Sequence, residues 1–214
     1  MLVETDIFDR LKVHATAEKR IYYGVPWGEY LRLREEFAEG SHLRMTYQRG
    51  VLEIMSPKRL HEQITRLIDM VVTLMAFETG RNVDNCGALT LRVAGIASGG
   101  EPDSCFYLAH EADVRGLSDI DLTLHPPPDL VVEVDISSPS LDKFELYAAA
   151  GVPEIWRHDE GRITFYRLTH NSYERISQSI CLPQLTSRLL ETYLHLGRTQ
   201  GSTAMLRRLK DDLA

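Results

Sequence analysis

The spacing of apolar residues predicts helices in several parts of the chain. The longest covers about 60–79, where apolar side chains recur at helical spacing: Leu60, Ile64, Leu67, Ile68, Val71, Val72 and Met75. A helix is also expected to begin at Pro26 and run to about Glu39, because proline fits a first helical turn and Gly40 is a stop signal. Shorter helical patterns cover 141–150 and the tail from about Gln184 onwards.

Strands are expected between these helices. Residues 43–55 predict a hairpin, because the runs LRMTYQ and VLEIM flank Arg49-Gly50. Further strands are expected near 86–93, 104–109, 153–158 and 162–168, with a turn over 97–100 and a long polar loop over 111–128. Strands mixed with helices, including one strand–helix–strand unit, predict an α/β sheet sandwich.

We expect one main domain with short additions at both ends. A chain of 214 residues can bury a core without disulfides or zinc. The predicted parts are an N-terminal segment over 1–25, the main domain over 26–183 and a helical C-terminal tail over 184–214.

The run DLVVEVDI, residues 129–136, carries the strongest chemical signal. Its apolar residues predict a buried central strand, yet Glu133 and Asp135 stand two residues apart and so project from the same face. Buried carboxylates are costly unless they are paired, protonated or bound to a metal. The next helix opens with Lys143. Two acids and a lysine beside one central strand are typical of a metal-dependent site that cleaves phosphodiester bonds.

Asp103 is the candidate second acid of such a site. It lies just before the apolar strand SCFYLA and thirty positions before Glu133, which leaves enough chain to return on the next strand. If the two strands are neighbours, both carboxylates can share Mg²⁺, which also takes waters and a substrate phosphate. Lys143 would then orient a water or neutralise charge on the phosphate. The alternative for Glu133 is a buried acid satisfied by a lysine or arginine, and the alternative for Lys143 is a solvated helix lysine.

Glu53 and His61 form a further candidate pair. Glu53 lies in the second strand of the hairpin and His61 opens the long helix, so both flank the Ser56-Pro57 break and could face one cleft. The alternative for His61 is an ordinary polar surface residue.

Composition limits the function classes. The chain has 31 acidic residues against 24 lysines and arginines, a formal net charge of −7, which disfavours tight DNA binding by a monomer. Three widely spaced cysteines fit reduced, structural thiols. The sequence has no apolar run typical of a signal peptide or a membrane span, so we expect a cytoplasmic protein without a membrane partner.

Four segments resemble the Uma family, bacterial restriction-endonuclease-like proteins of the PD-(D/E)XK nuclease superfamily. They are GVLEIMSP with His61 after it, GGEPDSCFYL, PPPDLVVEVDISSPS and LDKFELYAAAGVPEIW. The resemblance runs from about residue 26 to about residue 168, and its more specific marks include the run at 151–156.

The resemblance implies a restriction-endonuclease-like core, in which a mixed β-sheet is flanked by helices, and a Mg²⁺ site that also accepts Mn²⁺. By position, Asp103 is the motif aspartate and Glu133 the motif glutamate. The superfamily's lysine two residues after that glutamate is absent, and Asp135 stands in its place. The family has a lysine at the position of Lys143, which would reach the same place from the helix.

Two hypotheses follow. One is a Mg²⁺-dependent endonuclease acting on DNA, expected as a homodimer because duplex cleavage needs two sites. The other is a non-catalytic module that keeps the nuclease fold for structural or partner-binding work. The position of Lys143 separates them: convergence with Asp103 and Glu133 favours the enzyme, and a lysine pointing into solvent favours the module.

Overall fold

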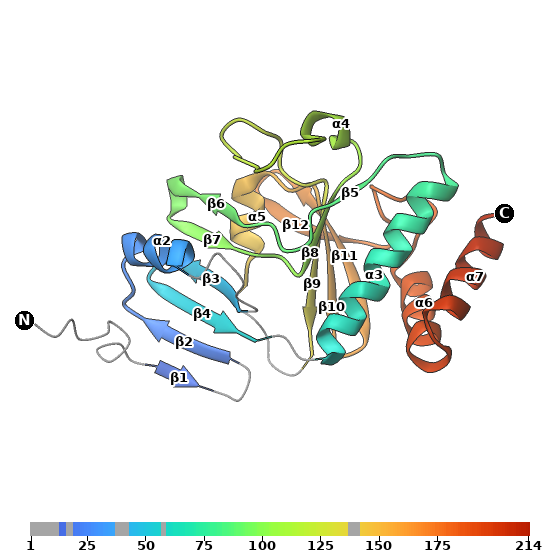
Figure 1. The fold of residues 1–214 in the computed structure, drawn as a ribbon, viewed down its shortest axis with the longest axis horizontal. Helices are drawn as coiled ribbons and strands as arrows, with labels where there is room; N and C mark the ends of the chain where they lie inside the picture. The colour runs from blue at the N-terminus through green and yellow to red at the C-terminus, as the bar shows by residue number, and fades with distance from the viewer. Residues whose placement is uncertain (1–12, 16–18, 37–42, 57–58, 137–141) are drawn as a thin grey trace, which may run out of the picture. The chain divides into compact units, whose positions relative to one another are not determined.

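The computed structural model describes residues 13–15, 19–36, 43–56, 59–136 and 142–214 (Figure 1). The chain divides into two compact units. The first comprises Met1–Lys58 and Thr90–Glu101, and the second comprises Arg59–Leu89 and Pro102–Ala214. The predicted division into 1–25, 26–183 and 184–214 stays a prediction.

The first unit is built on an antiparallel sheet with the strand order β1-β2-β4-β3-β7-β6. Its strands are β1 (Val13–Ala15), β2 (Lys19–Tyr23), β3 (Arg44–Gln48), β4 (Val51–Met55), β6 (Leu91–Val93) and β7 (Ser98–Gly100). A 3-10 turn, η1 (Ala94–Ile96), joins the last two. The predicted hairpin is confirmed as β3 and β4, and both Arg49 and Gly50 at its turn have positive φ, as tight hairpin turns require.

Helix α2 (Trp27–Glu36) supplies apolar side chains to the core of this unit. Tyr30 of α2 is fully buried and stacks on Tyr47 of β3, with ring centroids 5.0 Å apart. The helix predicted from Pro26 therefore forms.

The second unit is built on a mixed sheet with the order β12-β11-β10-β9-β8-β5. Its strands are β5 (Asp84–Asn85), β8 (Ser104–Tyr107), β9 (Leu130–Asp135), β10 (Glu154–Asp159), β11 (Arg162–Thr169) and β12 (Ser172–Ile176). β9 and β10 run parallel and are joined by helix α5 (Phe144–Ala150), which confirms the predicted strand–helix–strand unit. The other pairs are antiparallel.

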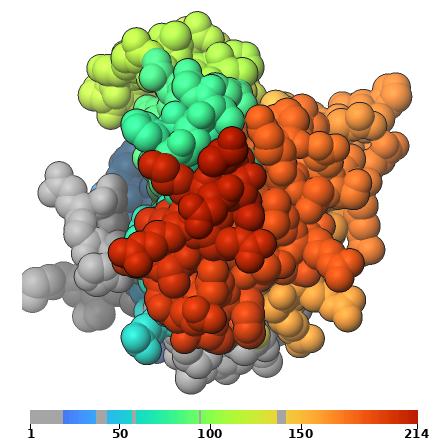
Figure 2. Space-filling view, turned by 90° about the vertical axis from the view of Figure 1, so that its right-hand side faces the viewer, coloured from blue at the N-terminus to red at the C-terminus, as the bar shows by residue number. Residues whose placement is uncertain are grey.

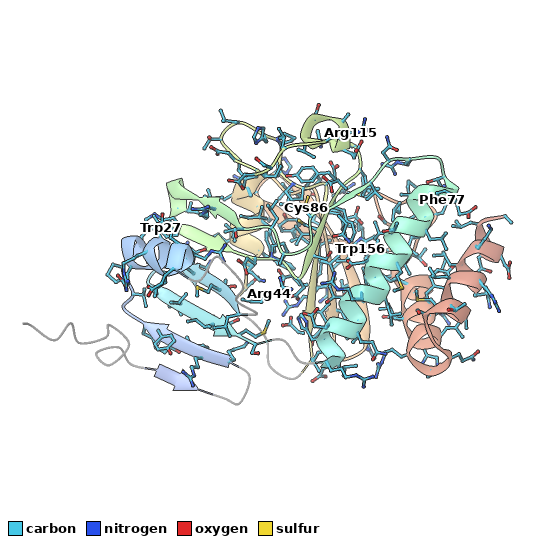
Figure 3. All side chains as sticks on the ribbon, in the orientation of Figure 1. Trp27, Arg44, Phe77, Cys86, Arg115 and Trp156 are labelled. Atoms are coloured by element: carbon cyan, nitrogen blue, oxygen red, sulfur yellow. The ribbon has the colours of Figure 1, made fainter. Side chains whose placement is uncertain are left out.

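Three helices, α3 (Arg59–Glu78), α6 (Ser187–Gln200) and α7 (Ser202–Leu213), cover one face of this sheet. They pack on one another, and Figure 2 shows α7 on the outer side of the layer. Val132 and Val134 of β9 face this layer, and so does the fully buried Trp156 of β10, which is labelled in Figure 3. As predicted, Glu133 and Asp135 project from the other face, because side chains alternate along a strand.

Several sequence-based expectations were wrong. Residues 98–100 form strand β7 rather than a turn, and the loop expected over 111–128 begins with helix α4 (Glu111–Val114). The strand expected near 86–93 is instead two short strands, β5 and β6, one in each sheet. Strands β1, β2 and β12 were not predicted. The helix end near Gly40, the break at Pro57 and the helix start at 141 lie outside the described residues.

Across the described residues, no helix is both long enough and apolar enough to cross a membrane.

Candidate functional site

The candidate site begins where β8 and β9 run side by side in the second unit. Ser104 pairs with Val132 in the antiparallel register, which sets Asp103 opposite Glu133. The backbone N–H of Asp103 donates to the carbonyl of Val132 (3.1 Å), and the N–H of Val134 donates to Asp103 Oδ2 (2.7 Å). The two candidate acids therefore come from neighbouring strands, as the spacing in the sequence required.

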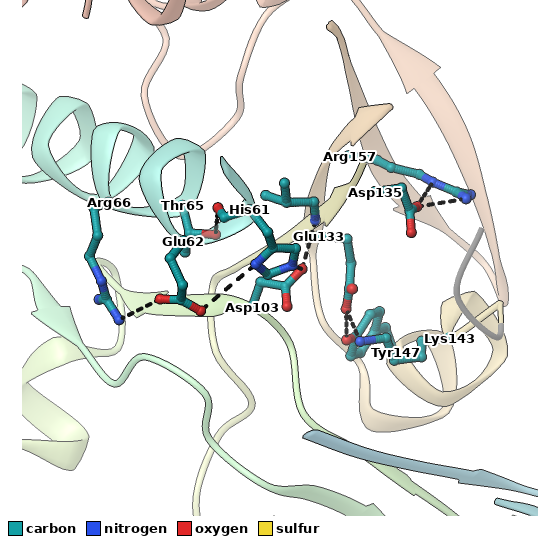
Figure 4. Close-up of polar contacts among 11 residues, drawn as sticks. His61, Glu62, Thr65, Arg66, Asp103, Glu133, Asp135, Lys143, Tyr147 and Arg157 are labelled. Atoms are coloured by element: carbon teal, nitrogen blue, oxygen red, sulfur yellow. Dashed lines mark hydrogen bonds and ion pairs between the residues drawn. The ribbon is translucent and has the colours of Figure 1, made fainter. Parts of the chain in front are cut away.

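His61 reaches Asp103 from the first turn of α3. Its Nε2 lies 3.1 Å from Asp103 Oδ2, and its Nδ1 lies 3.8 Å from Glu62 Oε1 (Figure 4). Burial of Asp103 disfavours its charged form, but the close contact with His61, the charge of Lys143 and the amide of Val134 outweigh burial. Together they hold the pKa of Asp103 below its ordinary value.

Glu133 is held from the other side by α5. Lys143 Nζ lies 2.7 Å from Glu133 Oε1, and the Tyr147 hydroxyl donates to the same oxygen. Burial raises the pKa of Glu133 to about 7, opposed by the positive charge of Lys143 and reinforced by the negative charge of Asp103. Lys143 is only 8% exposed, so its ammonium points into the site and not into solvent.

Asp135 has a different partner. Arg157 Nε and Nη2 each lie 3.0 Å from Asp135 Oδ2, and the guanidinium carbon lies 6.0 Å from the centre of the Phe144 ring. Arg157 is the register partner of Glu133 in the parallel pair of β9 and β10. The cation beside Asp135 thus comes from the next strand.

Glu53 belongs to the first unit. It lies in the middle of β4, is 3% exposed, and its Oε2 is 3.3 Å from Lys19 Nζ. This ion pair compensates the buried charge of Glu53. A role for Glu53 in the candidate site stays a prediction.

The donor set of Asp103 and Glu133 fits a hard divalent cation. Within the described part of the chain, their protein contacts use Asp103 Oδ2 and Glu133 Oε1, which leaves Asp103 Oδ1 and Glu133 Oε2 for a ligand. Across all residues that the structure describes, no group of three or more His, Cys, Asp or Glu side chains is arranged to hold a metal. Mg²⁺ suits such a pair, because it typically binds one or two carboxylates and completes its shell with waters and phosphate.

Three contacts of this site were not foreseen. Neither Tyr147 nor Arg157 was expected in the site, and His61 was grouped with Glu53 and not with Asp103. The spacing of four residues between Lys143 and Tyr147 places them on one helix face, which is the signal that could have joined Tyr147 to the site. Arg157 could be found only once β10 was known to run parallel to β9.

A solved structure shares the fold at low sequence identity. It is described as the "Crystal structure of a putative nuclease belonging to DUF820 from Anabaena variabilis ATCC 29413". The two chains superpose with a TM-score of 0.56 at 16% identity, over 79% of this chain and 99% of the other. The restriction-endonuclease-like core of mixed sheet and flanking helices agrees with this match.

No curated protein matches this chain in sequence. A family model does: Uma2, described as "Putative restriction endonuclease", matches residues 27–200, which is most of the chain. The resemblance drawn from the four sequence segments is confirmed, and the chain belongs to the Uma2 family.

Proposed function

We propose that the protein is a Mg²⁺-dependent endonuclease that hydrolyses phosphodiester bonds of DNA. The position of Lys143 carries this proposal. Its ammonium lies 2.7 Å from Glu133, which itself stands opposite Asp103, and it is buried. Convergence of two acids and a lysine supports the enzyme, since a non-catalytic module would have no need to keep these three buried charges together.

Each side chain has a defined task in this proposal. A bound Mg²⁺ would supply a Lewis acid and a bound water of lowered pKa. Asp103 and Glu133 would hold it through their remaining oxygens, while His61 and the Val134 amide keep the Asp103 carboxylate in one orientation. Lys143 would offset the negative charge that develops on the phosphate.

Asp135 is not needed as a metal ligand. It stands where the superfamily has its lysine, and it is paired with Arg157. Lys143, arriving from α5 and not from β9, provides the ammonium beside Glu133. The missing motif lysine therefore does not argue against a complete site.

A plasmid-nicking assay with Mg²⁺, with Mn²⁺ and with EDTA tests the proposal. We expect supercoiled DNA to be nicked or cut with either metal and left intact in EDTA. Asp103→Asn and Glu133→Gln should abolish cleavage. Glu174→Gln is the matched control, because its side chain is 58% exposed on β12.

The non-catalytic module predicts a different result. Without any metal, the charge of Glu133 is already compensated by Lys143, and its Oε1 accepts a hydrogen bond from Tyr147. If Lys143 serves only to compensate the charge of Glu133, neither Mg²⁺ nor Mn²⁺ should support cleavage of duplex or single-stranded DNA. Neither metal should then raise the melting temperature. Both negative results together would overturn the nuclease proposal.

A further inference from the structure

Arg157 lies on the same face of the sheet as the candidate metal ligands. β9 and β10 are parallel with Arg157 opposite Glu133, and register partners project from the same side of a sheet. Asp135, two residues after Glu133, points to this side as well. Glu133, Asp135 and Arg157 therefore line one surface near the C-terminal ends of two parallel strands (Figure 4).

The guanidinium of Arg157 is fixed and yet accessible. Nε and Nη2 both contact Asp135 Oδ2, and Phe144 lies against the guanidinium carbon. The Arg157 side chain is 27% exposed, while that of Asp135 is 9% exposed. Among the described residues, no atom accepts a hydrogen bond from Nη1. One edge of the guanidinium is thus oriented by the protein, and the other edge can meet a ligand.

A bound metal would offset the excess negative charge around Arg157. Four acids on or beside this surface, Asp103, Glu133, Asp135 and Asp159, exceed the two cations Lys143 and Arg157 by two charges when all are ionised, and the negative charge of Asp159 acts on Arg157. A divalent cation would cancel this excess. A phosphodiester, which carries one negative charge, would then meet Arg157 without net repulsion from the group.

We infer that Arg157 binds a phosphate of the nucleic-acid strand next to the scissile one, with Asp135 as the residue that positions it. This inference rests on the proposed nuclease function. The planar guanidinium offers paired donors that match phosphate oxygens. Glu133 and Asp135 are separated by about 6.6 Å along the strand, so the guanidinium meets a different phosphate from the one at the metal.

The competing explanation is purely structural. Asp135 is buried, and Arg157 could serve only to compensate its charge. In that case removal of Arg157 would lower stability and leave DNA binding unchanged. Stability and binding must therefore be measured on the same variants.

Binding of a labelled DNA duplex and of its single strand, measured by fluorescence anisotropy with Ca²⁺ in place of Mg²⁺, provides the test. We expect Arg157→Gln to weaken binding about tenfold, because a charge-assisted hydrogen bond is lost. It should also reduce the slope of log K against log salt by about one. Arg157→Lys should restore part of the affinity. Arg167→Gln is the matched control, since Arg167 is a 52% exposed arginine of the same sheet.

Two further measurements keep folding and binding apart. The double variant Asp135→Asn/Arg157→Gln leaves no unpaired charge, so it should recover stability without recovering affinity. Replacing single phosphates by neutral methylphosphonates should weaken wild-type binding at one position near the scissile bond. The same replacement should have no additional effect in Arg157→Gln. The metal-induced rise in melting temperature should be the same in wild type and Arg157→Gln, because Arg157 is no metal ligand.

The outcomes are distinguishable. Unchanged affinity and salt slope in Arg157→Gln, with DNA bound and cleaved by the wild type, would overturn the role of Arg157 and leave the nuclease function standing. Wild-type protein that neither binds nor cleaves DNA would overturn both.

Discussion

Two carboxylates of the candidate site differ in their protonation because their surroundings differ. Asp103 is buried but lies close to His61 Nε2 and accepts a hydrogen bond from the Val134 amide, and its pKa is lowered. Glu133 is buried beside Asp103, and its pKa is raised to about 7 despite the nearby Lys143. Such opposed shifts within one site are typical of functional carboxylate pairs.

Metal binding should depend on pH through Glu133. Its pKa in the folded protein lies above its ordinary value of 4.5, so below about pH 7 it holds a proton that a metal must displace. We expect millimolar Mn²⁺ to raise the melting temperature more at pH 8 than at pH 6, as measured by scanning fluorimetry. Asp103→Asn should abolish the rise at both pH values. Equal shifts at the two pH values would show that proton release from Glu133 is not coupled to binding.

Lys143→Met tests whether the lysine is a catalyst or only a counter-ion. Removing one member of a buried pair costs about 3–5 kcal/mol, and we expect a smaller loss here, because Glu133 can take up a proton. The loss should grow as pH rises, since the pKa of Glu133, already raised, rises further without the lysine. Urea unfolding of wild type and Lys143→Met at two pH values measures this loss in the free energy of unfolding.

The double variant Lys143→Met/Glu133→Met tests the counter-ion role alone. It should regain stability, because neither member of the pair remains as an unpaired buried charge. Its cleavage is lost in any case with the metal ligand Glu133, so the catalytic role is measured in Lys143→Met. Lys143→Met protein that still cleaves DNA would remove Lys143 from the catalytic residues.

At the scale of elements, amphipathic and strongly apolar segments were predictable from the sequence. α3 and β9 follow from side-chain periodicity, and the unit of β9, α5 and β10 follows from the order of its patterns. β12 was missed because it is an edge strand whose residues are mostly exposed and show no alternation. The pairs His61–Asp103 and Arg157–Asp135 depend on which elements are neighbours, and a linear pattern does not contain that information.

The run GVPEIW, one of the more specific marks of the family, has a structural explanation. Glu154 is fully buried and accepts hydrogen bonds from Trp156 Nε1 (2.7 Å) and from the backbone amides of Ile180 (3.0 Å) and Cys181 (2.8 Å). It therefore ties β10 to the segment that leads into α6. Conspicuous motif residues in this chain thus include some that serve the fold and not the site.

Strand β7 shows how a tertiary contact can override a local pattern. The run Ser98–Gly100 has the composition of a turn, yet it pairs with β3. A Cβ atom on Gly99 would lie 2.7 Å from the hydroxyl oxygen of Tyr30, whose ring is fully buried against Tyr47. The glycine is therefore required by the close approach of an aromatic ring.

Alanine substitution of two glycines should have opposite effects in the first unit. Gly99→Ala must displace the Tyr30 ring and should lower the free energy of unfolding by about 1–3 kcal/mol. Gly28→Ala is the matched control, because a Cβ there meets nothing within 4 Å and alanine favours a helix. We expect a gain of up to about 1 kcal/mol from it. Urea unfolding of both variants measures these changes in the free energy of unfolding. No change in Gly99→Ala would mean that the Tyr30 ring can move aside.

At the scale of the whole molecule, net charge is the main obstacle to DNA binding. A formal charge of −7 repels a polyanion, so local cations must act at short range. A homodimer would bring two sites and their cations onto one duplex. The tail after Gln184 is a candidate contact for a dimer, but its apolar residues, such as Leu190, Met205 and Leu209, already belong to the core of its own unit. A dimer through this tail would have to use its polar outer side.

The products of plasmid cleavage should report the assembly. Two sites acting on opposite strands convert supercoiled DNA to the linear form, whereas a monomer accumulates nicked circles. We expect light scattering at tens of micromolar protein to give the mass of a dimer and cleavage to give linear product. Adding excess Asp103→Asn protein should then shift the products toward nicked circles, because mixed dimers carry one active site. If scattering gives a monomer and the added variant leaves the product ratio unchanged, the protein acts as single subunits, and a duplex break would require two independent binding events.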